Sequence, residues 1–311
     1  MEPLISAKHL VKNFNGLIAV NDLSFNVYPG DVYGFLGQNG AGKSTCIRML
    51  LTLVSPNSGE IELFGQNLKT HRREILRQVG AVIERPDLYK FLTAYENLLL
   101  FARMSGMKPV RKTLMDQLEL VGLAERADSK VKTYSQGMKQ RLGIAVALVS
   151  DPKLVILDEP TNGLDPQGIA DMRNLILRLS RDMGKTVLVS SHLLSEIEQV
   201  ATRMIIIDKG KKMVEGRVNE LFDPGNTRVH LSVVQFDKAI ETIKGSPWAD
   251  SLEDSFESTI VIKIPAAAVP ELTRLIVNAG IDLLAVRPAN SLEDYFLSLT
   301  AGKQHVAHFT N

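Results

Sequence analysis

The feature that most constrains the fold is a glycine-rich segment that follows a short apolar run. Residues 31–36 are almost uniformly apolar and predict a buried strand. Residues 37–45 then read Gly-Gln-Asn-Gly-Ala-Gly-Lys-Ser-Thr, and three glycines among them allow the backbone to curl so that successive N–H groups point inward. Residues 43–52 predict a helix, whose N-terminus adds the positive end of its dipole. The sequence therefore predicts a strand, a loop and a helix that together hold an anion.

This loop matches the phosphate-binding P-loop, in which each side chain has a defined role. Lys43 is expected to reach the β- and γ-phosphates of a nucleotide, and Ser44 to give its hydroxyl group to Mg²⁺. The rest of the phosphate site is expected to be formed by Gly37, Asn39, Gly40, Ala41, Gly42 and Thr45, with Thr45 near the α-phosphate. We therefore predict that the chain binds ATP and Mg²⁺.

A second motif carries two carboxylates at the end of a strand. Residues 154–157 are four aliphatic residues, and Asp158 and Glu159 follow them, which is a Walker B pattern. We expect this strand to lie beside the P-loop strand, with Asp158 directed toward Mg²⁺. Glu159 can then act as the general base that polarises the attacking water.

Short apolar runs alternate with longer amphipathic stretches along the first 225 residues, which is typical of a parallel sheet covered by helices. Further central strands are expected at residues 186–190 and 204–208, and further helices at residues 94–104, 111–119, 138–148 and 168–182. A turn-rich segment at residues 223–226 marks a boundary. We expect a domain at residues 1–225, with a helical subdomain at about residues 85–150.

The remaining residues, 226–311, predict a smaller accessory domain. Strands are expected at residues 228–234, 259–264 and 281–286, and helices at residues 238–244, 270–279 and 292–299. This order favours an α+β sandwich of ferredoxin-like type.

Composition excludes several classes of protein. The 36 Lys and Arg residues against 35 Asp and Glu residues give a net charge of +1, which provides no broad basic field for nucleic acid. The single cysteine, Cys46, cannot form an internal disulfide and is expected to be a buried packing residue in a reducing compartment. No apolar run approaches the roughly 20 residues that a spanning helix needs, and the N-terminus lacks a signal peptide pattern. We expect a cytoplasmic protein that does not itself cross a membrane.

A third motif identifies the superfamily. Residues 134–141 read Tyr-Ser-Gln-Gly-Met-Lys-Gln-Arg and resemble the signature motif of ABC-type ATPases. Ser135 is suited to cap a helix and Gly137 to permit close backbone approach, so the first turn can bind a γ-phosphate. In this family that phosphate belongs to the nucleotide on a second subunit. One cassette per chain therefore implies a dimer, most simply a homodimer.

The other elements of the family follow in order. Phe14 stands where an aromatic ring stacks on adenine, residues 162–165 resemble the D-loop, and His192 stands at the position of the switch histidine. The resemblance implies that Asp165 organises the dimer contact and that His192 hydrogen-bonds the γ-phosphate and positions water. The interval from Lys43 to Ser135 is too short for the coiled-coil insertion of the chromosome-maintenance and DNA-break ATPases.

Two departures from the common pattern indicate a subgroup. Glu84 stands where most members carry a glutamine, and the signature reads Ser-Gln-Gly-Met in place of Ser-Gly-Gly-Gln. With residues 92–98 and 291–296, these features resemble the bacitracin- and daunorubicin-resistance type of export ATPase. Because a carboxylate ligates Mg²⁺ with a full charge, Glu84 is expected to bind the metal and to couple it to a membrane partner; the alternative is a solvated loop glutamate.

The resemblance implies an α/β P-loop NTPase fold with a mixed sheet and a helical subdomain. It also implies the ATP-binding and ATP-hydrolysing subunit of a bacterial exporter, peripheral on the inner face of the membrane and attached to a separate permease. Residues 85–91 are expected to contact that permease, with Tyr89 and Phe91 as anchors, or else to pack within the helical subdomain. The alternatives are a soluble ABC-type regulator or assembly factor, and a P-loop kinase, which the signature motif and His192 argue against.

Overall fold

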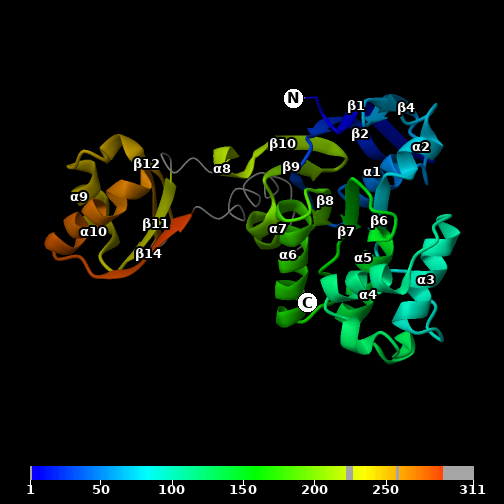
Figure 1. The fold of residues 1–311 in the computed structure, drawn as a ribbon. Helices are drawn as coiled ribbons and strands as arrows, with labels where there is room; N and C mark the ends of the chain where they lie inside the picture. The colour runs from blue at the N-terminus through cyan, green and yellow to red at the C-terminus, as the bar shows by residue number, and fades with distance from the viewer. Residues whose placement is uncertain (1, 222–226, 257–258, 290–311) are drawn as a thin grey trace, which may run out of the picture. The chain divides into compact units, whose positions relative to one another are not determined.

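The computed structural model describes residues 2–221, 227–256 and 259–289, and the chain divides into two compact units, Met1–Val218 and Asn219–Asn311. The first unit contains the predicted P-loop, Walker B and signature segments (Figure 1).

A six-stranded sheet in the order β10-β9-β3-β8-β7-β6 forms the centre of the first unit. These strands are β3 (Val32–Leu36), β6 (Val79–Ile83), β7 (Leu154–Asp158), β8 (Thr186–Ser191), β9 (Arg203–Asp208) and β10 (Lys211–Arg217). All run parallel except β10, which pairs antiparallel with β9. Strands β3, β7 and β8 are buried along their whole length, as expected for strands covered on both faces. The four central strands predicted from the sequence are confirmed, but β8 lies between β3 and β7, so the expectation that those two are neighbours was wrong.

A second, antiparallel sheet in the order β2-β1-β4-β5 was not predicted. Its strands are β1 (Ile5–Phe14), β2 (Leu17–Val27), β4 (Ser58–Leu63) and β5 (Gln66–Asn67). Register shifts along β1 interrupt the alternation of apolar and polar residues that would have revealed it. Its apolar face shares one core with the central sheet, where the ring of Phe25 contacts the rings of Tyr33 and Phe35 at centroid distances of 6.0 and 5.3 Å.

The helices lie close to their predicted positions. The first unit contains α1 (Lys43–Leu50), α2 (Arg72–Leu76), α3 (Ala94–Met104), α4 (Arg111–Leu120), α5 (Gln136–Leu148), α6 (Pro166–Arg181) and α7 (Leu194–Val200). The short helix α8 (Val218–Leu221) begins at the last residue of this unit and continues into the second. Helices α3, α4 and α5 gather on the side of the unit opposite the antiparallel sheet (Figure 1). Helix α3 begins with a capping box: Thr93 accepts the Glu96 N–H, and Glu96 accepts the Thr93 N–H at 2.7 Å.

The second unit is a four-stranded antiparallel sheet in the order β12-β13-β11-β14, with helices packed on it. Its elements are β11 (Thr227–Val233), α9 (Phe236–Lys244), β12 (Leu252–Phe256), β13 (Thr259–Ile264), α10 (Val269–Asn278) and β14 (Leu283–Ala289). Alternate residues of β11 and β13 enter the core, among them Leu231 and Ile262, with Ile243 and Ile276 from the helices. Strand β12 was not predicted, and the helix predicted at residues 292–299 lies outside the described residues.

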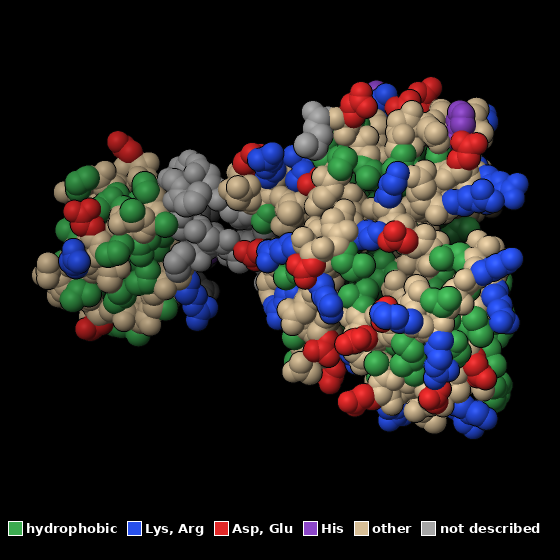
Figure 2. Space-filling model, in the orientation of Figure 1, with side chains coloured by type: hydrophobic (Ala, Val, Ile, Leu, Met, Phe, Trp, Pro, Cys, Tyr) green, Lys and Arg blue, Asp and Glu red, His purple; other side chains and the backbone are tan. Residues whose placement is uncertain are grey.

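Among the described residues, no helix is both long and apolar enough to span a bilayer. Positive and negative side chains are interspersed on the face of the first unit shown in Figure 2. On this face there is no broad field of one sign, in line with the nearly neutral sequence.

Candidate nucleotide-binding and catalytic site

The predicted phosphate loop connects β3 to α1, and its glycines are required by its backbone. Gly42 has a φ of +106° and forms the N-cap of α1, so the helix begins at Lys43 and the free N–H groups of its first turn face the loop that precedes it. A side chain at Gly37 would approach the Ile207 carbonyl oxygen to 2.6 Å, which a Cβ atom does not tolerate. The segment therefore has the strand, loop and helix arrangement that the sequence predicts for a phosphate site.

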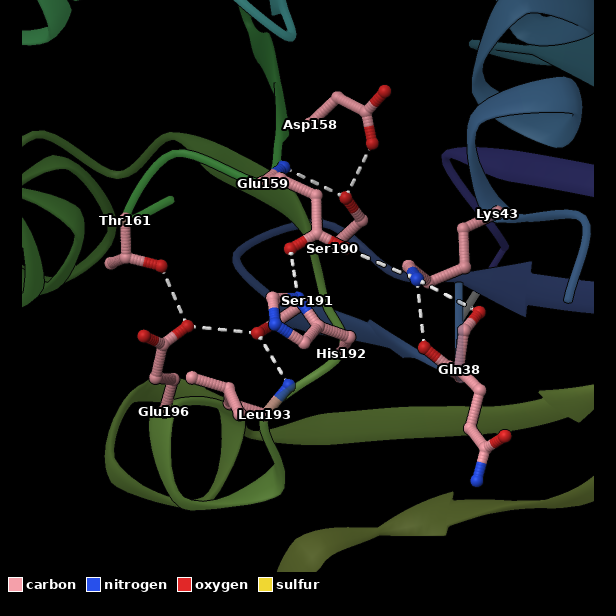
Figure 3. A network of polar contacts seen from close by, with 11 residues as sticks. Gln38, Lys43, Asp158, Glu159, Thr161, Ser190, Ser191, His192, Leu193 and Glu196 are labelled. Carbon is pink, nitrogen blue, oxygen red and sulfur yellow. Dashed lines mark hydrogen bonds and ion pairs between the residues drawn. The ribbon is translucent and has the colours of Figure 1, made fainter. Parts of the chain in front are cut away.

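Lys43 is drawn into this loop and is almost fully buried. Its Nζ atom donates to the carbonyl oxygens of Gly37 at 2.7 Å and Gln38 at 3.3 Å, and it lies 3.1 Å from Glu159 Oε1. Figure 3 shows the ammonium group directed toward the Gln38 carbonyl oxygen and the Glu159 carboxylate. The cation predicted for the phosphates and the carboxylate predicted as general base are therefore direct neighbours.

Glu159 bridges Lys43 to the predicted switch histidine. Its second oxygen, Oε2, lies 2.7 Å from His192 Nδ1 (Figure 3). Glu159 also has a φ of +51°, a conformation that is costly for a residue with a side chain and is concentrated at functional sites. The three residues predicted to be catalytic thus form one chain of contacts at the ends of neighbouring elements.

The two carboxylate oxygens of Asp158 differ in their hydrogen bonding. Ser190 donates its hydroxyl to Asp158 Oδ1 at 2.6 Å and accepts the Glu159 N–H at 2.9 Å. Asp158 Oδ2 is buried and has no hydrogen-bond partner among the described residues. A buried carboxylate oxygen without a donor is a costly feature that a cation would satisfy, so the chemistry of this position fits Mg²⁺.

Cys46 lies on α1, directly behind the phosphate loop, and is fully buried. Burial raises the pKa of its thiol far above the usual range. The thiol is therefore a packing group, as the sequence predicts.

The structure places the remaining predicted residues on separate elements. Ser135 is the N-cap of α5 and accepts the Met138 N–H at 3.2 Å, so this helix begins two residues before its predicted start. Asp165 caps α6 by accepting the Gly168 N–H at 3.0 Å. Phe14, the last residue of β1, is 43% exposed. Their roles toward nucleotide and dimer stay predictions.

Glu84 occupies a position that the sequence did not foresee. Its carboxylate forms an ion pair with Arg48 on α1 at 2.6 Å, and its main-chain oxygen accepts a hydrogen bond from Gln140 on α5 at 3.2 Å. Its φ of +56° is left-handed. The residue therefore connects the phosphate-loop helix to the helix that follows the signature serine, and its predicted role as an Mg²⁺ ligand stays untested.

Sequence reasoning missed a third carboxylate, that of Glu196, beside the catalytic residues Glu159 and His192. Glu196 Oε2 accepts the Thr161 hydroxyl at 2.6 Å and the Ser191 hydroxyl at 2.8 Å (Figure 3). Glu196 lies four residues after His192, in the first turn of α7, so an acidic residue at the start of the helix that follows His192 was the available signal.

Comparison with known proteins decides the family. The family model described as "ABC transporter" matches residues 20–162. The bacitracin transport ATP-binding protein BcrA of Bacillus licheniformis is 42% identical over 304 residues, which cover 97% of this chain and 99% of that protein. The chain belongs to the ABC transporter ATP-binding proteins. The resemblance inferred from the signature motif is thereby confirmed, and this ABC ATPase binds ATP.

Two further comparisons support the assignment. The Nod factor export ATP-binding protein I of Burkholderia orbicola (strain AU 1054) is 38% identical over 304 residues, which cover 95% of this ABC ATPase and 96% of that protein. Among solved structures, the dimeric post-hydrolysis state of the ATP-binding cassette MJ0796 bound to ADP and Pi superposes with a TM-score of 0.63 at 25% identity, covering 69% of this chain and 98% of that chain. The predicted P-loop α/β fold with a mixed sheet is confirmed.

Proposed function

We propose that this ABC ATPase is the energy-supplying subunit of an exporter, peripheral on the inner face of the cell membrane and bound to a separate permease. Full-length relatives are named for bacitracin transport and for Nod factor export, which supports this direction of transport. The observation that carries the catalytic part is the contact chain Lys43–Glu159–His192 at the mouth of the phosphate loop.

In the proposed reaction, Glu159 accepts a proton from the attacking water while the water oxygen bonds to the γ-phosphorus and the β,γ-bridging bond breaks. Lys43 stabilises the phosphate charge, and His192 orients Glu159 and the γ-phosphate. Bound Mg²⁺ would neutralise charge on the phosphates, with Asp158 and Ser44 as the residues that hold it. Glu84, whose carboxylate now pairs with Arg48, is proposed to join them once nucleotide is present.

A second copy of the chain is proposed to complete each site. The N-terminus of α5, with Ser135 and Gly137, would contact the γ-phosphate bound to the other copy, and Asp165 would line the contact between them. The ATP-binding cassette MJ0796, to which this chain is similar in fold, was solved as a dimer, which supports this arrangement.

The permease is proposed to bind beside the segment that follows Glu84. Phe91 is 79% exposed and Tyr89 is 51% exposed, although the Tyr89 ring also lies 6.1 Å from that of Phe101. Exposed aromatic side chains of this kind are typical anchors of protein interfaces. We further propose a ferredoxin-like fold for the C-terminal unit, because its strand and helix order, β-α-β-β-α-β, agrees with it.

The test is copurification combined with phosphate release. The tagged chain, expressed with the genes beside its own, should retain a polytopic membrane protein and hydrolyse ATP. A Phe91→Ser variant should no longer copurify with the membrane protein and should keep the basal rate of ATP hydrolysis. Hydrolysis without any copurifying membrane protein would favour a soluble regulator. Transfer of phosphate to an acceptor would favour a kinase. Either result would overturn the proposed exporter function.

A further inference from the structure

The ends of β7 and β8 are joined by three consecutive polar links. In the first, Ser190 connects Asp158 and the Glu159 N–H. The second is the contact between Glu159 and His192. The third is the Glu196 carboxylate, which receives the hydroxyl groups of Thr161 and Ser191 on a single oxygen atom. Figure 3 shows these links side by side.

The third link lies next to the catalytic pair on both chain segments. Thr161 comes two residues after Glu159, and Ser191 comes directly before His192. Glu196 therefore fixes the spacing between the two segments whose side chains must meet at 2.7 Å. We propose that Glu196 is a positioning residue for hydrolysis: it holds the Glu159 segment and the His192 segment at the distance that aligns the general base with the γ-phosphate.

Two hydrogen bonds hold the Glu196 carboxylate in this place. Glu196 borders a cavity of about 320 Å³ between α6 and α7, which Thr161 and Ser191 also line. The donors are well placed, because two hydroxyl groups reach one charged oxygen at 2.6 and 2.8 Å, and charge-assisted bonds of this length are strong.

Ser191 extends the same link toward the phosphate loop. Its hydroxyl accepts the Leu193 N–H at 2.9 Å, and its main-chain oxygen accepts the Gly37 N–H at 3.4 Å. A shift of Ser191 would thus move both the start of the phosphate loop and the backbone of the next residue, His192. Small displacements of catalytic groups cost roughly tenfold to a hundredfold in rate, which sets the size of the expected effect.

The experiment compares three variants of the full chain by steady-state phosphate release. Glu196→Ala should lower kcat by roughly tenfold or more with little change in KM for ATP. Glu196→Gln keeps an oxygen acceptor for both hydroxyl groups and should retain kcat within about twofold of the wild type. Glu198→Ala, on the exposed face of the same helix, is the matched control and should leave kcat unchanged.

A double-mutant cycle separates positioning from a general effect on stability. Thr161→Val removes the hydroxyl group at nearly constant volume, so it should lower kcat in the wild-type background and have no further effect in the Glu196→Ala background. If Glu196→Ala folds poorly, Thr161→Val alone still tests the proposal. This variant must then lower kcat while its midpoint of thermal unfolding stays at the value of the Glu198→Ala control.

Equal kcat values for Glu196→Ala and Glu198→Ala would overturn the proposal, and so would equal losses in Glu196→Ala and Glu196→Gln. The inference rests on the proposed role of Glu159. If Glu159→Gln kept full turnover, the proposed mechanism would fail; if Glu159→Gln were inactive and Glu196→Ala fully active, only the positioning role would fail.

Discussion

The ion pair between Lys43 and Glu159 makes a prediction about nucleotide affinity. The two side chains are 5% and 15% exposed, and their charged atoms lie 3.1 Å apart. At an effective dielectric constant of about 20, this separation corresponds to about 5 kcal/mol of Coulomb attraction, much of which desolvation offsets. ATP must therefore compete with Glu159 for the ammonium group of Lys43. Glu159→Gln removes this competition and the repulsion between the carboxylate and the γ-phosphate.

If about 1.4 kcal/mol of the attraction is recovered on binding, the dissociation constant for a non-hydrolysable ATP analogue should fall about tenfold in Glu159→Gln. At the same time, phosphate release should fall by roughly 10²-fold or more, because the general base is lost. Calorimetric titration of wild type and variant measures the first effect, and Glu198→Gln on the surface of α7 controls for the loss of one charge. Equal or weaker binding in Glu159→Gln would refute the idea that Lys43 is held by Glu159 before nucleotide binds.

Three further predictions follow from individual contacts. His192→Ala should lower kcat by roughly 10²-fold in a phosphate-release assay, because the group that orients Glu159 is lost; unchanged turnover would contradict that role. The Cys46 thiol, whose pKa is raised by burial, should resist iodoacetamide at pH 8 in the native protein and react once guanidinium unfolds it. The hydrogen bonds from the Thr93 N–H and hydroxyl lower the pKa of Glu96. The ionised Glu96 therefore stabilises the folded state at pH values above the glutamate pKa of the unfolded chain, about 4.3. This contribution is lost as the pH falls through the lowered pKa of the folded state. Urea unfolding should show that Glu96→Ala destabilises the protein at pH 7 and that the difference shrinks below pH 4.3; a constant difference would contradict the assignment.

Much of the central sheet was predictable because its strands are fully buried. Strands β3, β7 and β8 read as short apolar runs with glycine or acidic residues at their ends, and that signal survives without tertiary information. The antiparallel strands β1, β2 and β4 were missed because their exposure is irregular and bulges interrupt the period of two. Strand β12 was missed for a related reason, since it is short and rich in polar residues.

The site was predictable in its parts. Lys43, Asp158, Glu159, Ser135 and His192 each stand in a motif whose chemistry is local, because a phosphate loop, a strand end or a helix start is formed by consecutive residues. The ion pair of Glu84 could not be predicted from its neighbours in the sequence. Its partner Arg48 lies 36 residues earlier on α1, and no pattern in the sequence relates the two positions.

The sequence by itself determined the residue chemistry: an anion-binding loop, two carboxylates after a buried strand, a capped helix and a histidine after another strand. Only the tertiary structure decided that β8 separates β3 from β7, so that Ser190 and Ser191 stand between the phosphate loop and the carboxylates. It also decided that Glu159 contacts both Lys43 and His192, and that Glu196 holds the segments around them. The physical reason is that strand order and side-chain direction depend on how whole elements pack, which local sequence patterns do not encode.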